Sequence, residues 1–429
     1  MSATLAFPML VQAVSPRLGP VMGGAWFLFT VLKMIVIFTI YMVGVAMLTL
    51  AERKISAWIQ DRHGPNRVGK GWLQPAADGL KNFMKEETMP AGVNKPLFVL
   101  APILSFIPAL TAWSVIPFGA PIPTRWGRVD LVVADLPIGF LFILALTSLA
   151  VYGIVLAGWS SNNKYALLGG LRSSAQMVSY EISMGMSTIP ILLLAGNVSL
   201  NTIINQQAWG GWNVVNLTVA FFIFMVAAFA ETNRLPFDLP EAESELIAGY
   251  HTEYSAMKFS LFFISEYASM VTASALMATL FFGGWDVPFT SHDNIGPYSG
   301  WLSLLSIGIF LGKILFFLFL FMWIRWTLPR FRYDQLMSLG WKFMLPLALV
   351  YIVLIAAVLL GLSAAGIHEG FMSATILGSV NVALVIILFA ILDRGRIISP
   401  AYGRMHPREI ERLRRLDRRA RVPAVEAAS

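Results

Sequence analysis

Long apolar runs recur along almost the whole chain, and they constrain its fold more than any other feature. Each is long enough to cross a hydrocarbon layer of about 30 Å. They lie at 26–50, 97–116, 131–157, 174–195, 212–230, 256–282, 301–323, 343–362 and 374–392. Hydrophobic residues make up 57% of the 429 residues and charged residues only 13%, which is not the composition of a soluble domain. The sequence therefore predicts an all-α, polytopic membrane helix bundle of about nine transmembrane helices.

The basic residues of the links predict the orientation of this bundle. If the N-terminus is outside, most link Lys and Arg residues fall on the inner side, at 51–95, at 325–343 and after residue 393. The outer side then carries only Arg17, Arg125 and Arg128. Because basic residues concentrate in cytoplasmic loops, we expect a membrane domain at 1–393 and a basic cytoplasmic tail at 394–429.

Metal and cofactor chemistry find little support in the composition. The chain has no cysteine, which removes disulfides and any iron–sulfur cluster ligated by its own sulfurs. Its five histidines show no ligand spacing such as H-E-x-x-H. We therefore expect neither a metal site nor a redox centre in this chain.

The link at 231–254 is unusually acidic and is predicted to be cytoplasmic. It sets one basic residue, Arg234, against the carboxylates of Glu231, Asp238, Glu241, Glu243, Glu245 and Glu253. Asp238, Pro240 and Glu241 are typical of a helix start, and acids in a first turn complement the helix dipole. That explanation leaves out Glu231, Glu245 and Glu253. Like charges this close favour proton binding, so we favour proton carriers over capping alone.

The first link, 51–95, combines basic residues with an amphipathic helix. Glu52 and Arg53 close the first span, and Arg62 precedes a turn at 63–66. A helix is predicted from Gln74–Pro75, with one face formed by Asp78, Lys81 and Lys85 and an apolar side formed by Leu80, Phe83 and Met84. Two interpretations fit this pattern equally: an interfacial anchor with snorkelling lysines, or a helix lining an entrance for an amphiphilic ligand.

Several charges lie inside the predicted spans, where each costs roughly 2.5–3.5 kcal/mol on insertion scales. They are Lys33, Glu181, Lys258, Glu266 and Lys313. Lys258 and Lys313 can snorkel or pair structurally. Glu181 follows Tyr180 and Glu266 precedes Tyr267, both well inside a span. With Glu231, Glu241 and Glu245, these two acids are predicted to form a buried acidic chain from the link towards the middle of the membrane.

These motifs together resemble a known family. The resemblance rests on Ala51–Lys54, on the segments 62–69 and 73–78, on the turn 161–165, on Ser179–Glu181 and above all on 230–254. In this order they are similar to the H subunit of bacterial NADH:quinone oxidoreductase, respiratory complex I, whose mitochondrial equivalent is subunit 1. The resemblance extends to about residue 345 and does not include the basic tail.

The resemblance implies a multi-pass subunit of the bacterial cell membrane that takes part in proton-pumping NADH:quinone oxidoreduction, with quinone as substrate. Its partners would be hydrophilic-arm subunits that carry the terminal iron–sulfur cluster, together with small and antiporter-like membrane-arm subunits and the lipid bilayer, but no nucleic acid. The quinone chamber and its entrance would include Glu52, Arg53, Arg62, Asp78, Lys81, Arg234, Asp238, Glu253, Glu266 and Tyr267. The proton path would include Glu181, Glu231, Glu241, Glu243 and Glu245.

Two other classes share many of these features. One is the membrane anchor subunit of a related energy-conserving hydrogenase, and the other is a secondary ion transporter, in which intramembrane charges are also common. A transporter predicts inverted repeats and broken helices in matching halves, and the sequence has neither. The basic first link and the resemblance favour the quinone enzyme.

Overall fold

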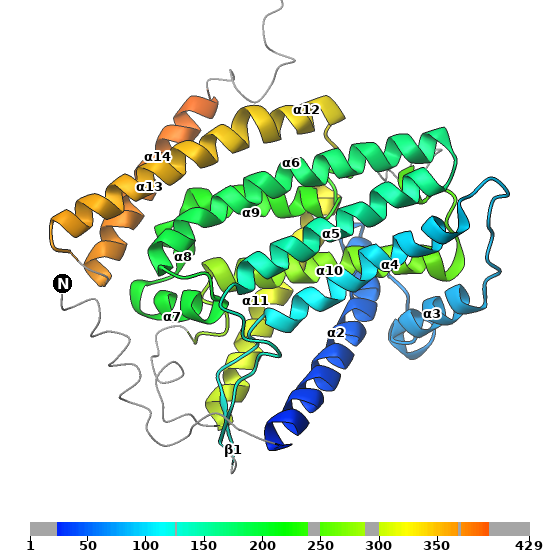
Figure 1. Cartoon of the computed structure of the whole chain (residues 1–429), viewed down its shortest axis with the longest axis horizontal. Coiled ribbons are helices and arrows are strands. Elements are labelled where there is room, and N and C mark those ends of the chain that lie inside the picture. The colour runs from blue at the N-terminus through cyan, green and yellow to red at the C-terminus, as the bar shows by residue number, and fades with distance from the viewer. Residues whose placement is uncertain (1–23, 125–126, 239–248, 288–299, 368–369, 394–429) are drawn as a thin grey trace, which may run out of the picture. The chain divides into compact units, whose positions relative to one another are not determined.

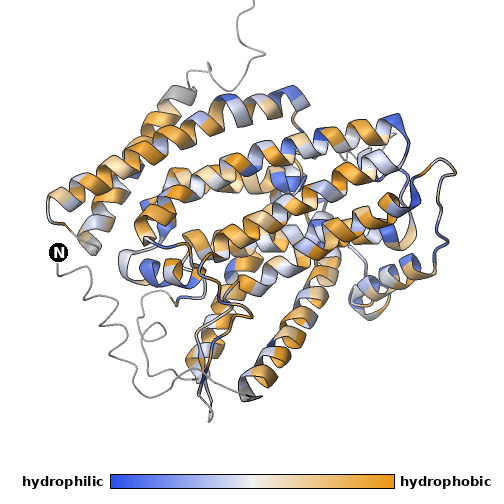
Figure 2. Cartoon of the chain, in the orientation of Figure 1, coloured by the Kyte–Doolittle hydropathy of each residue, from blue (hydrophilic) through white to orange (hydrophobic). Residues whose placement is uncertain are grey.

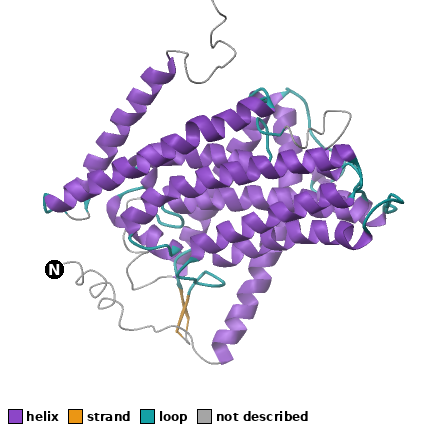
Figure 3. Ribbon diagram, turned by 45° about the horizontal axis from the view of Figure 1, so that its top comes forward, coloured by secondary structure: helices purple, strands orange, loops and turns teal. Residues whose placement is uncertain are grey.

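The computed structural model describes residues 24–124, 127–238, 249–287, 300–367 and 370–393, and this part of the chain is almost entirely helical (Figure 3). Eight of its helical segments are long and apolar enough to cross a membrane. They are formed by α2 (Gly24–Ile59), α4 (Lys95–Thr111), α5 (Gly139–Ser160), α6 (Lys164–Ala195), α10 (Ala256–Phe281), α11 (Gly300–Thr327), α12 (Tyr333–Ser338) joined to α13 (Leu345–Ala364), and α14 (Phe371–Asp393). The predicted all-α membrane fold is confirmed.

The span predicted at 212–230 is interrupted. It forms the short helix α8 (Asn213–Asn216) and then α9 (Thr218–Glu231), with Leu217 outside helical geometry between them. The 14 residues of α9 extend about 21 Å at about 1.5 Å per residue, less than a hydrocarbon layer of about 30 Å. The number of nine crossings and the orientation of the ends therefore stay predictions.

The residues up to Asn381 form one compact unit, and α10 is its most buried membrane helix, with 72% of its most apolar stretch inside. Helices α4, α5 and α6 pack side by side in chain order, and α6 also contacts α9 and α13 (Figure 1). Helix α10 packs against α4, α11 and α2. Because α10 is surrounded in this way, charges on it meet several other elements.

Hydropathy follows this arrangement. Figure 2 shows long helices that are mostly hydrophobic, with hydrophilic residues gathered near their ends and in the links. Large apolar side chains are exposed on α2 and α13, for example Leu28 at 66% and Val353 at 70%. Exposed apolar surface on this scale suits contact with lipid rather than water.

The links contain several shorter elements. Helix α3 (Gln74–Met84) begins at the predicted Gln–Pro pair, and the turn between α5 and α6 forms as predicted, with the Asn163 side chain accepting from the Tyr165 backbone N–H at 2.9 Å. By contrast, α7 (Leu200–Gly210) occupies a link predicted to be an ordinary connection, because Ile203, Ile204 and Gln207 give it a buried face. Strands β1 (Ile122–Thr124) and β2 (Gly127–Val129) form a small antiparallel pair.

Three 3₁₀ turns and one π-helix complete the described elements. The 3₁₀ turns are η1 (Gly69–Gly71), η2 (Ala112–Val115) and η3 (Gly249–His251). The π-helix η4 (Leu339–Met344) joins α12 to α13. There the Tyr180 hydroxyl of α6 donates to the Leu336 carbonyl at 2.8 Å, and Trp341 Nε1 donates to Ser179 Oγ at 3.0 Å. These contacts fix the α12–α13 segment against α6.

Candidate functional site

A buried cluster of charges joins α2, α10, α11 and the segment after α9. Arg234 Nε lies 2.7 Å from Glu266 Oε1, and its Nη1 lies 3.4 Å from Glu52 Oε2. Arg325, near the end of α11, makes a short ion pair with the same Glu52 carboxylate. Tyr267 donates its hydroxyl to Glu52, and the Arg234 guanidinium stacks 4.3 Å from the centre of the Tyr267 ring. We call these residues the ion-pair cluster.

The charges of the ion-pair cluster balance. Arg234 is only 3% exposed and Glu52 only 6% exposed, so each requires an opposite charge to offset its desolvation. Burial by itself lowers the pKa of Arg234, but the carboxylates of Glu266 and Glu52 outweigh it and hold that pKa well above its ordinary value. Arg234 is therefore a fixed positive charge between two carboxylates.

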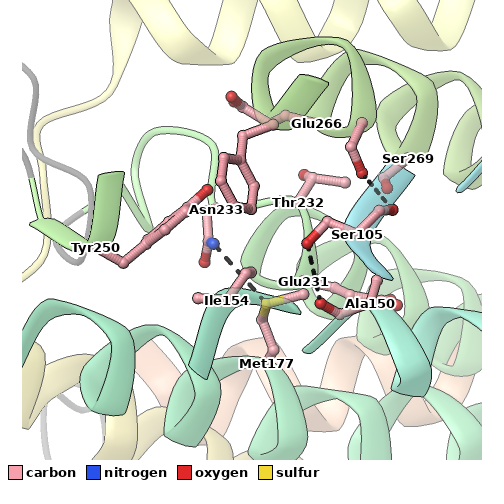
Figure 4. A pocket seen from close by; sticks show the side chains of 12 residues that line it. Ser105, Ala150, Ile154, Met177, Glu231, Thr232, Asn233, Tyr250, Glu266 and Ser269 are labelled. Carbon is pink, nitrogen blue, oxygen red and sulfur yellow. Dashed lines mark hydrogen bonds between the residues drawn. The ribbon is translucent and has the colours of Figure 1, made fainter. Parts of the chain in front are cut away.

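A cavity of about 40 Å³ lies next to this cluster (Figure 4). It is large enough for a few water molecules, each of which requires about 10–15 Å³. Glu266 lines it from α10 and Glu231 lines it from the end of α9. Its other walls are formed by Ser105, Ala150, Ile154, Met177, Thr232, Asn233, Tyr250, Phe262, Ser265 and Ser269. Glu266 thus belongs both to the ion-pair cluster and to a cavity that has a second carboxyl group in its wall.

Further acids continue from this cavity. The Glu231 side chain is in hydrogen-bond contact with Thr147 of α5 and interacts electrostatically with Glu181 of α6. The Ser148 hydroxyl of α5 donates to the Glu181 carboxylate. The structure therefore brings Glu266, Glu231 and Glu181, which come from three different helices, into one succession of acidic groups.

The segment after α9 is held by side chains of other elements. Gln176 of α6 donates through Nε2 to the carbonyls of Ala230 and Phe237, at 2.9 and 2.8 Å. Asp238, predicted to cap a helix, forms an ion pair with Arg330 at 3.6 Å. The helix predicted to begin there, with Glu241, Glu243 and Glu245, lies outside the described residues. What the structure adds is a cationic partner for Asp238.

The predicted entrance residues form a second, more exposed group. Arg53 Nη1 lies 2.9 Å from Asp78 Oδ2, and Lys81 Nζ lies 3.5 Å from Asp78 Oδ1. On α3 the apolar residues Leu80, Phe83 and Met84 are 61%, 75% and 76% exposed. This confirms an amphipathic helix whose apolar face the rest of the described chain leaves open.

Two predicted site residues lie elsewhere. Arg62 is exposed and donates through Nε to Gln60 Oε1 at 2.6 Å. Glu253 accepts from Asn163 Nδ2 at 2.7 Å, beside the turn between α5 and α6. In these contacts both residues interact with neighbours of the links and not with the ion-pair cluster.

The lysines inside the spans pair structurally. Lys258 lies 2.9 Å from Glu87. Lys33 donates to the carbonyls of Asp130 and Val132 at 3.0 and 2.8 Å, and Lys313 likewise donates to backbone carbonyls. The prediction that Lys258 and Lys313 pair structurally is confirmed.

Sequence reasoning missed the cationic partners and the hydroxyl groups of the site. Arg325 and Arg330 stood out only as basic residues of an inner link, and Thr147 and Ser148 gave no signal. A charge balance would have found the arginines, since buried carboxylates require cations.

The fold and the site define a class: a membrane helix bundle with a charge-balanced buried cluster that adjoins a water-sized cavity lined by acids. Comparison with known proteins identifies the family within this class. The family model described as NADH dehydrogenase matches residues 32–356. The chain therefore belongs to the NADH dehydrogenase family, and the predicted resemblance is confirmed.

Relatives from several bacteria agree with this assignment, and each is named as an H subunit of NADH-quinone oxidoreductase. The one from Leptospira biflexa serovar Patoc is 51% identical over 338 residues, which cover 76% of this chain and 93% of the relative. The first of the numbered forms from Cytophaga hutchinsonii is 49% identical over 325 residues, 76% of this chain and 94% of the relative. The corresponding form from Geobacter metallireducens is 51% identical over 330 residues, 76% of this chain and 95% of the relative.

Proposed function

We propose that this chain is the membrane subunit of a proton-pumping NADH:quinone oxidoreductase. It forms much of the quinone chamber at the junction with the hydrophilic arm and couples quinone reduction to proton translocation through buried carboxylates. One observation carries this proposal: Glu266 is paired with Arg234 at 2.7 Å and also lines the cavity that contains Glu231. A change of charge at the ion-pair cluster is thereby linked to a group that can accept a proton.

The coupling begins with competition for arginine. Quinone reduced near the cluster carries negative charge, which attracts the guanidinium groups of Arg234 and Arg325 in a medium of low dielectric. As Arg234 shifts its interaction from Glu266 towards that charge, Glu266 becomes a buried carboxylate with a weakened partner. Such a group binds a proton more readily because burial disfavours its charged form.

The proton then moves along the acidic succession. Water in the cavity connects Glu266 to Glu231, and Glu231 interacts with Glu181 deeper in the bundle. Hydroxyl groups of Thr147 and Ser148 support the last two acids. Glu241, Glu243 and Glu245 complete the cytoplasmic end of this path in the proposal.

The entrance for quinone is formed by α2 and α3. Quinones carry an apolar chain and a polar head, and the exposed apolar face of α3 lies beside the Arg53–Asp78 pair. This combination supports a lipid-facing approach to the cluster. Arg62, Lys81 and Glu253 belong to the polar rim in this proposal.

The remaining chemistry belongs to partners. Electrons would come from an iron–sulfur cluster of a hydrophilic-arm subunit, since this chain has no cysteine to ligate one. Small and antiporter-like membrane subunits would receive the proton path. The bacterial relatives support the cell membrane as the location, and their names favour the quinone enzyme over a hydrogenase anchor or an ion transporter.

The variant Glu266→Gln tests the proposal. Its amide oxygen can still accept from Arg234 Nε, so the fold is preserved while the titrating group is removed. We expect coupled proton pumping and NADH-dependent quinone reduction in assembled complex to fall by about tenfold or more. The matched control is Glu87→Gln, which alters the exposed partner of Lys258. Normal pumping by assembled Glu266→Gln complex would remove Glu266 from the path.

A further inference from the structure

The C-terminal end of α10 is buried and is satisfied by side chains from other elements. A helix end leaves its last carbonyl groups without partners in the helix, and at membrane depth each unsatisfied group is costly. Gln207 of α7 donates to the Thr279 carbonyl and Asn213 of α8 donates to the Leu280 carbonyl, both at 2.9 Å. Gln207 Oε1 also accepts from the Gly283 backbone N–H at 2.9 Å. This end is therefore a constructed site and not a frayed terminus.

Carbonyl groups just beyond it converge on one ammonium. Lys313 Nζ donates to the carbonyls of Phe282, Gly284 and Asp286 at 2.7, 2.8 and 3.1 Å. It also lies 5.3 Å from the centre of the Trp212 ring. Lys313 is close to the middle of α11, which spans Gly300–Thr327, so the carbonyls that it meets lie at the depth of the middle of that helix.

The backbone that presents these carbonyls depends on glycine. Gly283 and Gly284 have φ angles of 71° and 55°, in the left-handed region that other residues rarely adopt. At Gly284 an added Cβ would lie 2.7 Å from Ile204 Cδ1. The two glycines therefore permit the turn that aims the carbonyls of Phe282 and Gly284 at a common point.

We propose that the end of α10 is a binding site for an ammonium-type cation, and that Lys313 is its tethered occupant. The N–O distances are those of N–H···O hydrogen bonds, and the carbonyls provide one acceptor for each donor of an ammonium group. The negative end of the α10 dipole favours a cation, as does the face of the Trp212 ring. The ligand class is ammonium and primary alkylammonium ions.

This arrangement differs from that of the other lysine on the same pair of helices. Lys258, at the beginning of α10, lies beside the carboxylate of Glu87, and a carboxylate can be protonated. The carbonyl site cannot lose its acceptors through protonation, so it is a permanent clamp. It fixes the end of the helix that carries Glu266 and Tyr267. Its consequence for activity rests on the proposed function, whereas the cation site itself does not.

Chemical rescue tests the site. Lys313→Ala removes the side chain beyond Cβ, and propylammonium contains the same missing atoms. In the full complex in membranes, Lys313→Ala should lower the temperature of thermal inactivation by about 5 °C or more, and millimolar propylammonium should restore at least half of that shift. Tetramethylammonium, which has the charge but no N–H donor, should not. Equal effects of both ions, or of neither, would overturn the proposal.

The variant Lys258→Ala is the matched control, because it removes a lysine that pairs with a carboxylate. Propylammonium should leave its inactivation temperature unchanged. If Lys313→Ala does not assemble, Lys313→Gln and Lys313→Met decide the question by the amount of complex on a native gel. Gln retains N–H donors and should assemble at least threefold better than Met, and equal amounts would contradict the site. Glu266→Gln leaves this site intact, so its result is independent.

Discussion

Helices α2 and α11 each bury charge at two places, and they do so in two different ways. At one place α2 contributes Glu52 and α11 contributes Arg325 to the ion-pair cluster. At the other, Lys33 and Lys313 donate to backbone carbonyls. Carboxylates can be protonated whereas backbone carbonyls cannot at physiological pH. The comparison teaches that responses to protons are confined to the ion-pair cluster, while the lysine sites hold the same helices in place.

The largest expected effect comes from removing the central cation. Arg234→Leu leaves Glu52 and Glu266 buried with a missing partner, a loss of about 3–5 kcal/mol for a broken buried pair. We expect little assembled complex on a native gel. Lys33→Met, which strands two carbonyls at about 1–3 kcal/mol each, should assemble better. Equal assembly of the two variants would break the distinction between the two regions.

Acid should weaken the cluster side next, through His251. Burial lowers the pKa of His251 to about 4, below its ordinary value of 6.5 in the unfolded chain. The unfolded state therefore binds a proton first as the pH falls, and the stability contributed by neutral His251 is complete above pH 6.5 and is lost towards pH 4. The loss between pH 7 and pH 5 is about 2 kcal/mol.

This pH effect is measured as the inactivation temperature of the complex at pH 7 and pH 5. His251→Gln has no imidazole to titrate and should show a smaller difference between the two values. Lys33→Met should retain the difference seen in the original chain, because its site contains no titrating acceptor. An unchanged difference in His251→Gln would show that another group causes it.

A smaller free-energy change with a clear functional readout is expected for Glu231→Gln. The variant retains an acceptor for Thr147 but removes a proton carrier from the cavity. Proton pumping should fall by about tenfold, while assembly stays normal. Glu253→Gln alters an acid held by Asn163 beside the α5–α6 turn and should pump nearly normally. If Glu253→Gln had the larger effect, the cavity would not be the centre of the path.

The smallest effect is expected at the exposed pair of Asp78 with Arg53 and Lys81. Lys81 is 65% exposed, and such surface pairs contribute about 0–1 kcal/mol. Lys81→Ala should leave assembly unchanged and alter at most the KM for quinone. A large fall in kcat would move the functional centre from the buried cluster to the α3 surface.

The local features of the chain could be read from the sequence. The beginning of α3 at Gln74–Pro75 and the turn before α6 depend on residues that are neighbours in sequence, as does the apolar character of each long helix. The break between α8 and α9 was missed because every residue at 212–217 suits an apolar run. Helix α7 was missed because its buried face depends on what covers it.

The sequence by itself determined that this protein is a membrane helix bundle with acids concentrated between two spans, because hydropathy and helix capping act over a few residues. Only the tertiary structure decided which charges meet. Arg234 and Glu52 are 182 residues apart, and Arg325 and Glu52 are 273 apart. Their pairing follows from how α2, α10 and α11 pack, since a buried charge requires a partner within a few ångströms in space and places no condition on distance along the chain.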